Sequence, residues 1–317
     1  MLTTAVKRVA RGLLVVLLVT IAAQALLSLT PGGVAEGILG ENATDENIAA
    51  LNAKLGLDQP PWQQYLDWLG GALHGDLGSS LVSQQPVREA IIERIPVTFE
   101  LAFLGMAIAL AAATVFAVVG ATRPGSRIDR ALNAVSSVFL STPGFVAGPL
   151  LVYFLAMQLP VFPVLGWKPL SDGLGANLGS AFLPALAIAV QEIAALHRLL
   201  RTDLISTLGE DFIAAARARG MSGMYVMFRH AFRPSAFSLV TVLGINLGRL
   251  LGGTVIVEVL FSLPGCGGLL VQSITSRDIV MVQGMVTFVA TVYVLMNLLV
   301  DFSYGLLDPR VRKVMTA

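Results

Sequence analysis

Four ionisable side chains lie in or beside apolar stretches, and they are the first residues to examine for chemistry. They are Glu100, Glu192, Arg249 and Glu258. A charged group inside a bilayer costs several kcal/mol unless it is paired or hydrated, so all four should face the interior of a helix bundle. Arg249 and Glu258 are separated by about 13.5 Å along one helix, so each needs a partner on another helix. Arg249 and Glu258 are the candidate residues of a polar path through the bundle. Arg249 either faces that path and attracts a carboxylate, or forms an interhelical salt bridge. Glu100 and Glu192 are expected near the membrane interfaces, where a structural role competes with a functional one.

The remaining reactive residue types form no catalytic or metal-binding pattern. Cys266 is the single cysteine, and the three histidines, His74, His197 and His230, lack the spacing of metal ligands. The expected cytoplasmic segments contain no nucleophile, paired carboxylate or glycine-rich phosphate loop. The sequence therefore predicts that this chain holds no cofactor and does not itself hydrolyse a nucleotide. Nucleic acid is not expected as a partner either, because the net charge is only +1.

A basic segment, residues 201–234, carries the strongest pattern for an interaction with another protein. Asp211–Arg219 is alanine-rich, begins with an acid and ends with bases, which predicts a helix whose charges match its dipole. Gly220 is expected to end it. A second short helix is expected over Met224–Phe232, before Pro234 opens the next apolar stretch. A short, smooth helix of this kind fits a groove on a partner; the alternative is an ordinary amphipathic surface helix.

These residues must be positioned by membrane-spanning helices. Hydrophobic residues make up 55% of the 317 residues and charged ones 13%, with a mean hydropathy of +0.77, which indicates an all-α integral membrane protein. A span needs about 20 apolar residues. We expect about six spans, which lie approximately at Val9–Leu29, Val97–Gly120, Leu132–Gln158, Ala181–Leu200, Ala236–Leu260 and Val280–Tyr304.

The distribution of basic residues predicts the orientation. Of the 21 Lys and Arg residues, fifteen fall in segments on the side of the N-terminus, five on the other side, and Arg249 in a span. Because cytoplasmic segments are enriched in Lys and Arg, both termini are expected in the cytoplasm. The first span resembles a signal peptide, with bases before an apolar run that contains Ala23-Gln24-Ala25, but the run continues through Leu29 and favours an uncleaved anchor.

The segment between the first two spans is long enough to fold. Thr44 and the acids after it predict a helix start, and Pro60-Pro61 followed by aromatic residues predicts a second short helix at the interface. This outer segment is either a simple cap or a surface that receives a partner. Pro264-Gly265 and Gly267-Gly268 around Cys266 predict a tight outer turn, in which a structural role for Cys266 is favoured. The glycines at positions 244, 248, 252 and 253 suit either an interface with a second subunit or bundle packing.

At residues 211–233 the chain resembles a known family. Asp211-Phe212-Ile213-Ala214-Ala215-Ala216-Arg217-Ala218-Arg219-Gly220 and Arg229-His230-Ala231-Phe232-Arg233 are similar to the coupling motif of ABC import permeases of the dipeptide, oligopeptide and nickel type. Further similar segments are His74–Ser80, Arg94–Thr98, Val257-Glu258, Phe261–Gly265, Asp301 and Leu307–Arg312, and they are typical of the first permease, with a long outer loop. Ala214 replaces the motif's glutamate and Pro234 is shifted by one position, as in the peptide-importer variant.

The resemblance implies a type I ABC importer permease in a bacterial inner membrane. Its domains would be an N-terminal transmembrane helix (1–29), an extracytoplasmic loop domain (30–96), a permease core (97–305) with a coupling helix at 211–220, and a cytoplasmic tail (306–317). The implied partners are a second homologous permease, two cytoplasmic ATP-binding subunits or one fused ATPase, an extracytoplasmic substrate-binding protein and membrane lipid. ATP and Mg would be bound by the ATPases. The implied coupling residues are Asp211, Ala214, Ala215, Ala216, Arg217, Arg219, Gly220, Arg229, His230 and Arg233.

Two other classes of membrane protein predict different sequence features. A self-sufficient secondary transporter or channel predicts an inverted internal repeat, and no convincing repeat occurs. A membrane enzyme would need clustered acids, histidines or cysteines near an interface, and none cluster. Peptides are the expected substrate, although a nickel chelate, glutathione and haem are alternatives, because specificity in such importers largely resides in the binding protein.

Overall fold

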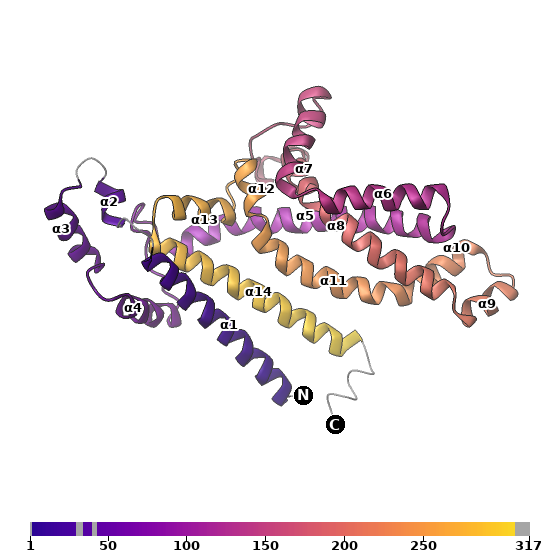
Figure 1. The fold of residues 1–317 in the computed structure, drawn as a ribbon, viewed down its shortest axis with the longest axis horizontal. Helices are drawn as coiled ribbons and strands as arrows, with labels where there is room; N and C mark the ends of the chain where they lie inside the picture. Colours follow the sequence, from indigo (N-terminus) through magenta and orange to yellow (C-terminus); the bar gives the residue numbers. More distant parts are fainter. Residues whose placement is uncertain (1, 30–33, 40–42, 308–317) are drawn as a thin grey trace. The chain divides into compact units, whose positions relative to one another are not determined.

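The computed structural model describes residues 2–29, 34–39 and 43–307, and it divides the chain into two compact units (Figure 1). Unit 1 comprises the described residues of Met1–Thr98, Leu251–Val255 and Pro264–Ala317, and unit 2 comprises Phe99–Leu250 and Ile256–Leu263. Every regular element within the described residues is helical. The expected all-α class is therefore confirmed. Residues 308–317 lie outside the described residues. They include Arg310, Arg312 and Lys313, three of the basic residues that are predicted to be cytoplasmic.

Unit 1 is built around two long helices, α1 (Leu2–Ser28) and α14 (Ile279–Leu307), which run side by side in Figure 1. The approach is close at Gly12, where an added Cβ would lie 2.5 Å from Val294 Cγ1. The Gln283 side chain on α14 also donates to the Thr20 carbonyl on α1 at 2.9 Å.

The outer segment folds into three short helices, α2 (Val34–Leu39), α3 (Asp45–Leu55) and α4 (Pro61–Leu73). Thr44 caps α3 by accepting the Asn47 N–H, and Gly56 ends it with φ +68°. Pro61 opens α4, because a proline at the first helical position loses no hydrogen bond. The two helix starts predicted at Thr44 and Pro60-Pro61 are confirmed.

Unit 1 also contains a small apolar core where α13 (Cys266–Thr275) meets α14 and the first turns of α5 (Val87–Thr122). Cys266 is 2% exposed, and its backbone N–H donates to Thr98 Oγ1. Asp278, just before α14, accepts hydrogen bonds from Ser80 Oγ and from the backbone of Leu81. These contacts give Cys266 a structural setting.

Unit 2 contains the rest of α5 and a bundle centred on α8 (Leu174–Leu208), whose inner face is almost completely buried. Helices α6 (Arg127–Ser141) and α7 (Gly144–Leu151) pack on α8. The remaining elements are η2 (Val152–Gln158), η3 (Leu170–Asp172), α9 (Asp211–Ala218), α10 (Gly223–Tyr225), η4 (Val226–Ala231), α11 (Phe232–Gly253) and α12 (Val255–Leu260).

Five of the described helices are long and apolar enough to cross a membrane, and a bent pair brings the number to six if it counts as one span. The bent pair corrects the expected continuous span over Leu132–Gln158: α6 and the helix from Gly144 to Gln158 meet at 108°. Pro143 disfavours helical geometry at the preceding residue, and Thr142 is extended with ψ 104°. The expected span over Ala236–Leu260 is also interrupted, since α11 ends at Gly253 and α12 begins at Val255.

The second and fourth spans are longer than expected. Helix α5 begins at Val87, ahead of the predicted Val97, and carries Pro96 inside it. Helix α8 extends the predicted Ala181–Leu200 at both ends and includes Pro184. Prolines within spanning helices are tolerated where neighbouring groups satisfy the freed backbone, which explains why these prolines do not mark the ends.

Candidate functional site

The predicted docking helix is present as α9, which confirms the helix assigned to Asp211–Arg219. Glu210 precedes it in an extended conformation, and Ile213 and Ala216, three residues apart on one face, are buried. The helix ends as Gly220 adopts φ +77°. The Gly220 N–H donates to the Arg217 carbonyl at 2.9 Å and the Met221 N–H to the Ala216 carbonyl at 3.3 Å, which is a Schellman ending.

The prediction of a separate helix over Met224–Phe232 is wrong. Ser222 caps α10, and the chain continues through the π-helical η4 directly into α11. The Phe232 N–H bonds to the Met227 carbonyl, five residues back. Pro234 therefore lies inside a continuous helical stretch, three residues after the end of η4, and it does not open the helix as the sequence predicted.

The segment from α9 to η4 packs on the rest of unit 2 through its own buried residues. Helix α9 packs on η4, and η4 packs on α8. Val226, Met227 and Ala231 of η4 are buried. Thr207 near the end of α8 and Ser235 near the start of α11 share a hydrogen bond of 3.1 Å between their hydroxyls. The loop is therefore a packed structure rather than a free connection.

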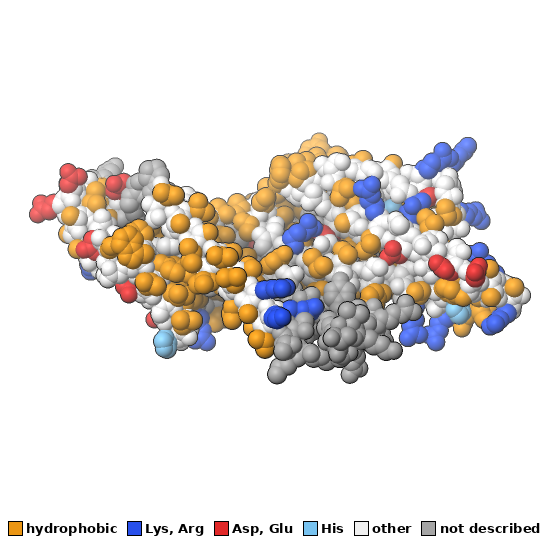
Figure 2. Space-filling model, turned by 60° about the horizontal axis from the view of Figure 1, so that its bottom comes forward, with side chains coloured by type: hydrophobic (Ala, Val, Ile, Leu, Met, Phe, Trp, Pro, Cys, Tyr) orange, Lys and Arg blue, Asp and Glu red, His pale blue; other side chains and the backbone are white. Residues whose placement is uncertain are grey.

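Large apolar side chains are exposed on this loop. Phe212 is 49% exposed, Met224 70%, and Tyr225 and Phe228 50% each. Figure 2 shows Lys and Arg side chains at the end of unit 2 where Figure 1 places α9 and α10. Exposed apolar groups rimmed by charge are typical of a protein-binding surface. We call the exposed residues Phe212, Ala215, Met224, Tyr225 and Phe228 the α9 surface.

The predicted coupling residues divide by exposure. Ala216 is buried and His230 is half-buried. The His230 ring meets that of Tyr225 at 5.5 Å, and its Nε2 is buried with no hydrogen-bond partner among the described residues. The exposed members are Asp211, Ala214, Ala215, Arg217, Arg219, Gly220, Arg229 and Arg233.

Behind the loop, α8 is joined to α6 by a bidentate ion pair. Arg201 Nε and Nη2 donate to the two carboxylate oxygens of Asp129 at 2.6 Å each. Asp129, 2% exposed, also accepts from the Gly125 N–H at 2.8 Å and from Asn133 Nδ2 at 2.9 Å. Gly120 of α5 lies so close that an added Cβ would be 2.9 Å from Asp129 Oδ1. All of these donors bond to one buried carboxylate, and the cluster therefore has a structural role.

A second ion pair joins α8 to α11. Arg249 Nη2 donates to Glu192 Oε1 at 2.5 Å, and Asn246 Nδ2 donates to Glu192 Oε2 at 2.7 Å. The Glu192 side chain is 3% exposed, whereas that of Arg249 is 64% exposed. The partner of Arg249 is thus on another helix, as the sequence required. Glu192 lies well inside α8 rather than near its ends.

Glu258 is fully buried on α12, and its carbonyl accepts the Leu263 N–H at 2.8 Å. The ion pair that Arg249 forms in the structure is the one with Glu192. Within residues 2–29, 34–39 and 43–307, no group of three or more His, Cys, Asp or Glu side chains is placed to hold a metal ion.

Sequence reasoning did not identify Asp129 or Asn246. Asp129 stands among Arg123, Arg127 and Arg130, and an isolated acid in a basic segment is a usable signal for an ion pair. Asn246 has no such signal, because an asparagine in an apolar helix shows its role only once the neighbouring helix is known.

Comparisons with known proteins agree over nearly the whole chain. Residues 95–313 match the family described as binding-protein-dependent transport system inner membrane component, and residues 1–102 match its N-terminal region. The chain is 39% identical over 306 residues to a protein of Brucella abortus (strain 2308) described as a peptide transport system permease, covering 96% of this chain and 98% of that one. It is 35% identical over 318 residues to the dipeptide transport system permease protein of Escherichia coli (strain K12), covering 93% and 94%.

A solved structure shares the fold. The crystal structure described as an amino acid ABC transporter with histidines aligns with a TM-score of 0.50 at 21% identity, covering 70% of this chain and 94% of that one. At this identity the likeness concerns the fold alone. The family matches, the relatives and the apolar helices lead to one conclusion: the chain belongs to the family of binding-protein-dependent transport system inner membrane components and is a multi-pass permease of the type I ABC importer fold.

Proposed function

We propose that this chain forms half of the translocation pathway of an ATP-driven peptide importer and transmits the force of ATP binding through α9. The observation that carries the proposal is the α9 surface. Ile213 and Ala216 fasten α9 to its own unit, while Phe212 and Ala215 remain exposed. A helix held on one face and free on the other is suited to docking in a partner's groove.

Peptides are the proposed substrate because the relatives are described as peptide and dipeptide permeases. The proposed partners are a second homologous permease, an extracytoplasmic substrate-binding protein, and two cytoplasmic ATP-binding subunits or one fused ATPase. The chain itself is non-catalytic and carries no cofactor, and the ATPases bind ATP and Mg. Both termini lie in the cytoplasm, which puts α9 on the cytoplasmic side and the 30–96 domain outside.

The half-exposed Arg249 is proposed to contact substrate within the permease core, residues 97–305. Glu192 holds one side of the guanidinium, and the 64% exposure of the Arg249 side chain leaves donors available for a carboxylate. Glu258, buried on α12, is the second residue proposed for the pathway.

The central test replaces Ala215 with Trp in the assembled importer. A bulky residue on the α9 surface should weaken docking by about 1–3 kcal/mol, which is about 5- to 150-fold in affinity for the ATPases. ATP-dependent peptide uptake into vesicles should fall in parallel. The matched control is Ala53→Trp, at an exposed alanine on α3, which should retain both ATPase binding and uptake.

If Ala215→Trp leaves ATPase binding and uptake unchanged, the α9 docking proposal is overturned. Peptide uptake by the purified chain without any ATPase would instead support a self-sufficient transporter.

A further inference from the structure

Unit 1 contains a pocket that the proposed translocation function does not use. It lies between the turn joining α3 to α4, the α4 helix and the ends of α1 and α14. Its volume is about 260 Å³, just below the usual range of small-molecule sites, roughly 300–1,000 Å³. A pocket of this size admits a ligand of one or two amino-acid residues.

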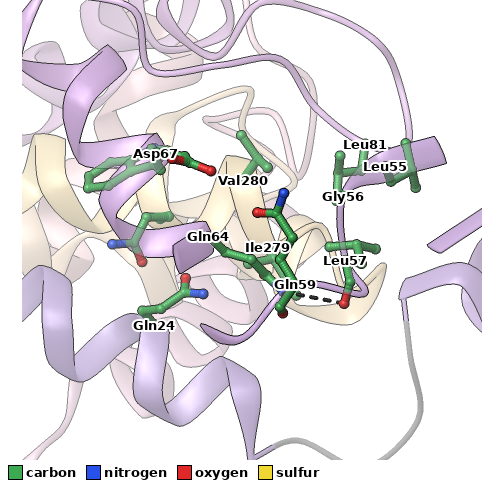
Figure 3. A pocket seen from close by; sticks show the side chains of 12 residues that line it. Gln24, Leu55, Gly56, Leu57, Gln59, Gln64, Asp67, Leu81, Ile279 and Val280 are labelled. Atoms are coloured by element: carbon green, nitrogen blue, oxygen red, sulfur yellow. Dashed lines mark hydrogen bonds between the residues drawn. The ribbon is translucent and has the colours of Figure 1, made fainter. Parts of the chain in front are cut away.

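The charges of the residues that line the pocket disfavour the binding of an anion. None of the described residues that line the pocket is a Lys, Arg or His, and Asp67 of α4 contributes the one carboxylate. Figure 3 shows the Asp67 carboxylate and the Gln24 carboxamide on the same side of the group. A phosphate or carboxylate would find no cation here, whereas an ammonium group would be attracted to Asp67.

The pocket also has unsatisfied hydrogen-bonding atoms. Gln283 is 2% exposed, and its Nε2 bonds to the Thr20 carbonyl, but its Oε1 has no donor among the described residues. The Trp68 Nε1–H is likewise buried without an acceptor. A buried polar atom without a partner is costly, so a ligand that supplies one donor and one acceptor would be favoured.

The surroundings of Gln283 make this a built site rather than a chance hollow. Thr20 of α1 is 3% exposed and shares a 2.9 Å hydrogen bond with the hydroxyl of Tyr65 on α4. Gln64 is held by its Nε2 bonds to the carbonyls of Leu57 and Gln59 at 3.3 and 2.8 Å, and all three residues line the pocket. Thr20, Tyr65 and Gln64 are therefore held before any ligand arrives, which lowers the entropic cost of binding.

We propose that this pocket binds the amino-terminal end of a short peptide. The ammonium group lies against Asp67, a peptide carbonyl accepts the Trp68 N–H, a peptide N–H donates to Gln283 Oε1, and an apolar side chain fits among Leu55, Leu57 and Ile279. The choice of a peptide as occupant rests on the proposed peptide transport, whereas the preference for cationic amide ligands rests on the lining alone. The site uses none of the residues proposed for the pathway.

The test measures binding to the full chain in phosphatidylcholine nanodiscs by saturation-transfer NMR. Two probes are titrated: alanyl-leucine amide, which has an ammonium group and no carboxylate, and N-acetyl-alanyl-leucine, which has the reverse. The amide should bind and the acetylated probe should bind at least about fivefold more weakly. Asp67→Asn and Trp68→Phe should each weaken the amide about fivefold, while Asp58→Asn, at an exposed acid outside the pocket, should leave it unchanged.

Several results would overturn the proposal. One is no binding of the amide, or equal binding of both probes; another is equal affinity in the Asp67→Asn and unmodified chains. Loss of amide binding in Arg249→Ala but not in Asp67→Asn would assign the probe to the proposed pathway and remove the pocket from consideration. Loss of peptide binding when phosphatidylethanolamine replaces phosphatidylcholine would identify a lipid ammonium as the occupant instead. ATP-dependent uptake, measured separately, tests the transport function itself.

Discussion

Two arginine–carboxylate pairs, each with one residue on α8, have the same chemistry but differ in how far the arginine is exposed. Asp129 and Arg201 are enclosed, with the Arg201 side chain 22% exposed, and the carboxylate receives further bonds from a backbone N–H and an asparagine. Glu192 is equally buried, but its Arg249 partner is 64% exposed. A closed pair fixes helices, whereas an open pair leaves hydrogen-bond donors for another molecule. The comparison separates a structural arginine from a candidate substrate-binding one.

Removing the closed pair should give the largest effect. Arg201→Met leaves Asp129 buried without its cation, which should destabilise the fold by about 3–5 kcal/mol. Unfolding of the purified chain by denaturing detergent, followed by circular dichroism, measures the loss. Arg198→Met, three residues earlier on α8 and exposed, is the control and should change stability little. Equal stability of the two variants would show that the closed pair is not structural.

A methyl group added beside the Asp129–Arg201 pair should have the next largest effect on stability. Gly120→Ala places a Cβ 2.9 Å from Asp129 Oδ1 and 3.6 Å from Arg201 Cδ and Nε, so the ion pair itself has to shift to make room. We expect a loss of about 1–3 kcal/mol in the same unfolding measurement. Gly179→Ala on α8, where nothing lies within 4 Å of the added Cβ, should be neutral or slightly stabilising because alanine favours helix over glycine. A neutral Gly120→Ala would mean that the three helices separate easily.

The spans and the docking helix could be predicted from the sequence because they depend on local patterns. Hydropathy located the long helices, and the acid at Asp211, the bases and Gly220 located α9. Hydropathy alone did not reveal the 108° bend, since the apolar run continues through Thr142 and Pro143. The partner of Arg249 could not be predicted, because helix packing alone determines which of Glu192 and Glu258 faces it.

Removing Arg249 from the second pair should alter selectivity in addition to stability. Arg249→Ala should reduce uptake of peptides with a free carboxyl terminus about tenfold, a difference of about 1.4 kcal/mol, and affect the corresponding peptide amides less. Reconstituted vesicles with radiolabelled substrates measure both. Arg249→Lys retains the charge without the planar donor fork and should be intermediate. Equal loss for acids and amides would give Arg249 the same structural role as Arg201.

The smallest expected effects come from the two asparagines that support the pairs. Asn133→Leu and Asn246→Leu each remove one amide donor from a buried carboxylate, at a distance of 2.9 Å from Asp129 and 2.7 Å from Glu192. Each should cost about 1 kcal/mol in unfolding, since the arginine still pairs with the carboxylate. Only Asn246→Leu should also change the ratio of acid to amide uptake, because Glu192 then turns more freely and positions Arg249 less well. A change in that ratio for Asn133→Leu as well would mean that the closed pair also reaches the substrate, and the division of roles along α8 would be wrong.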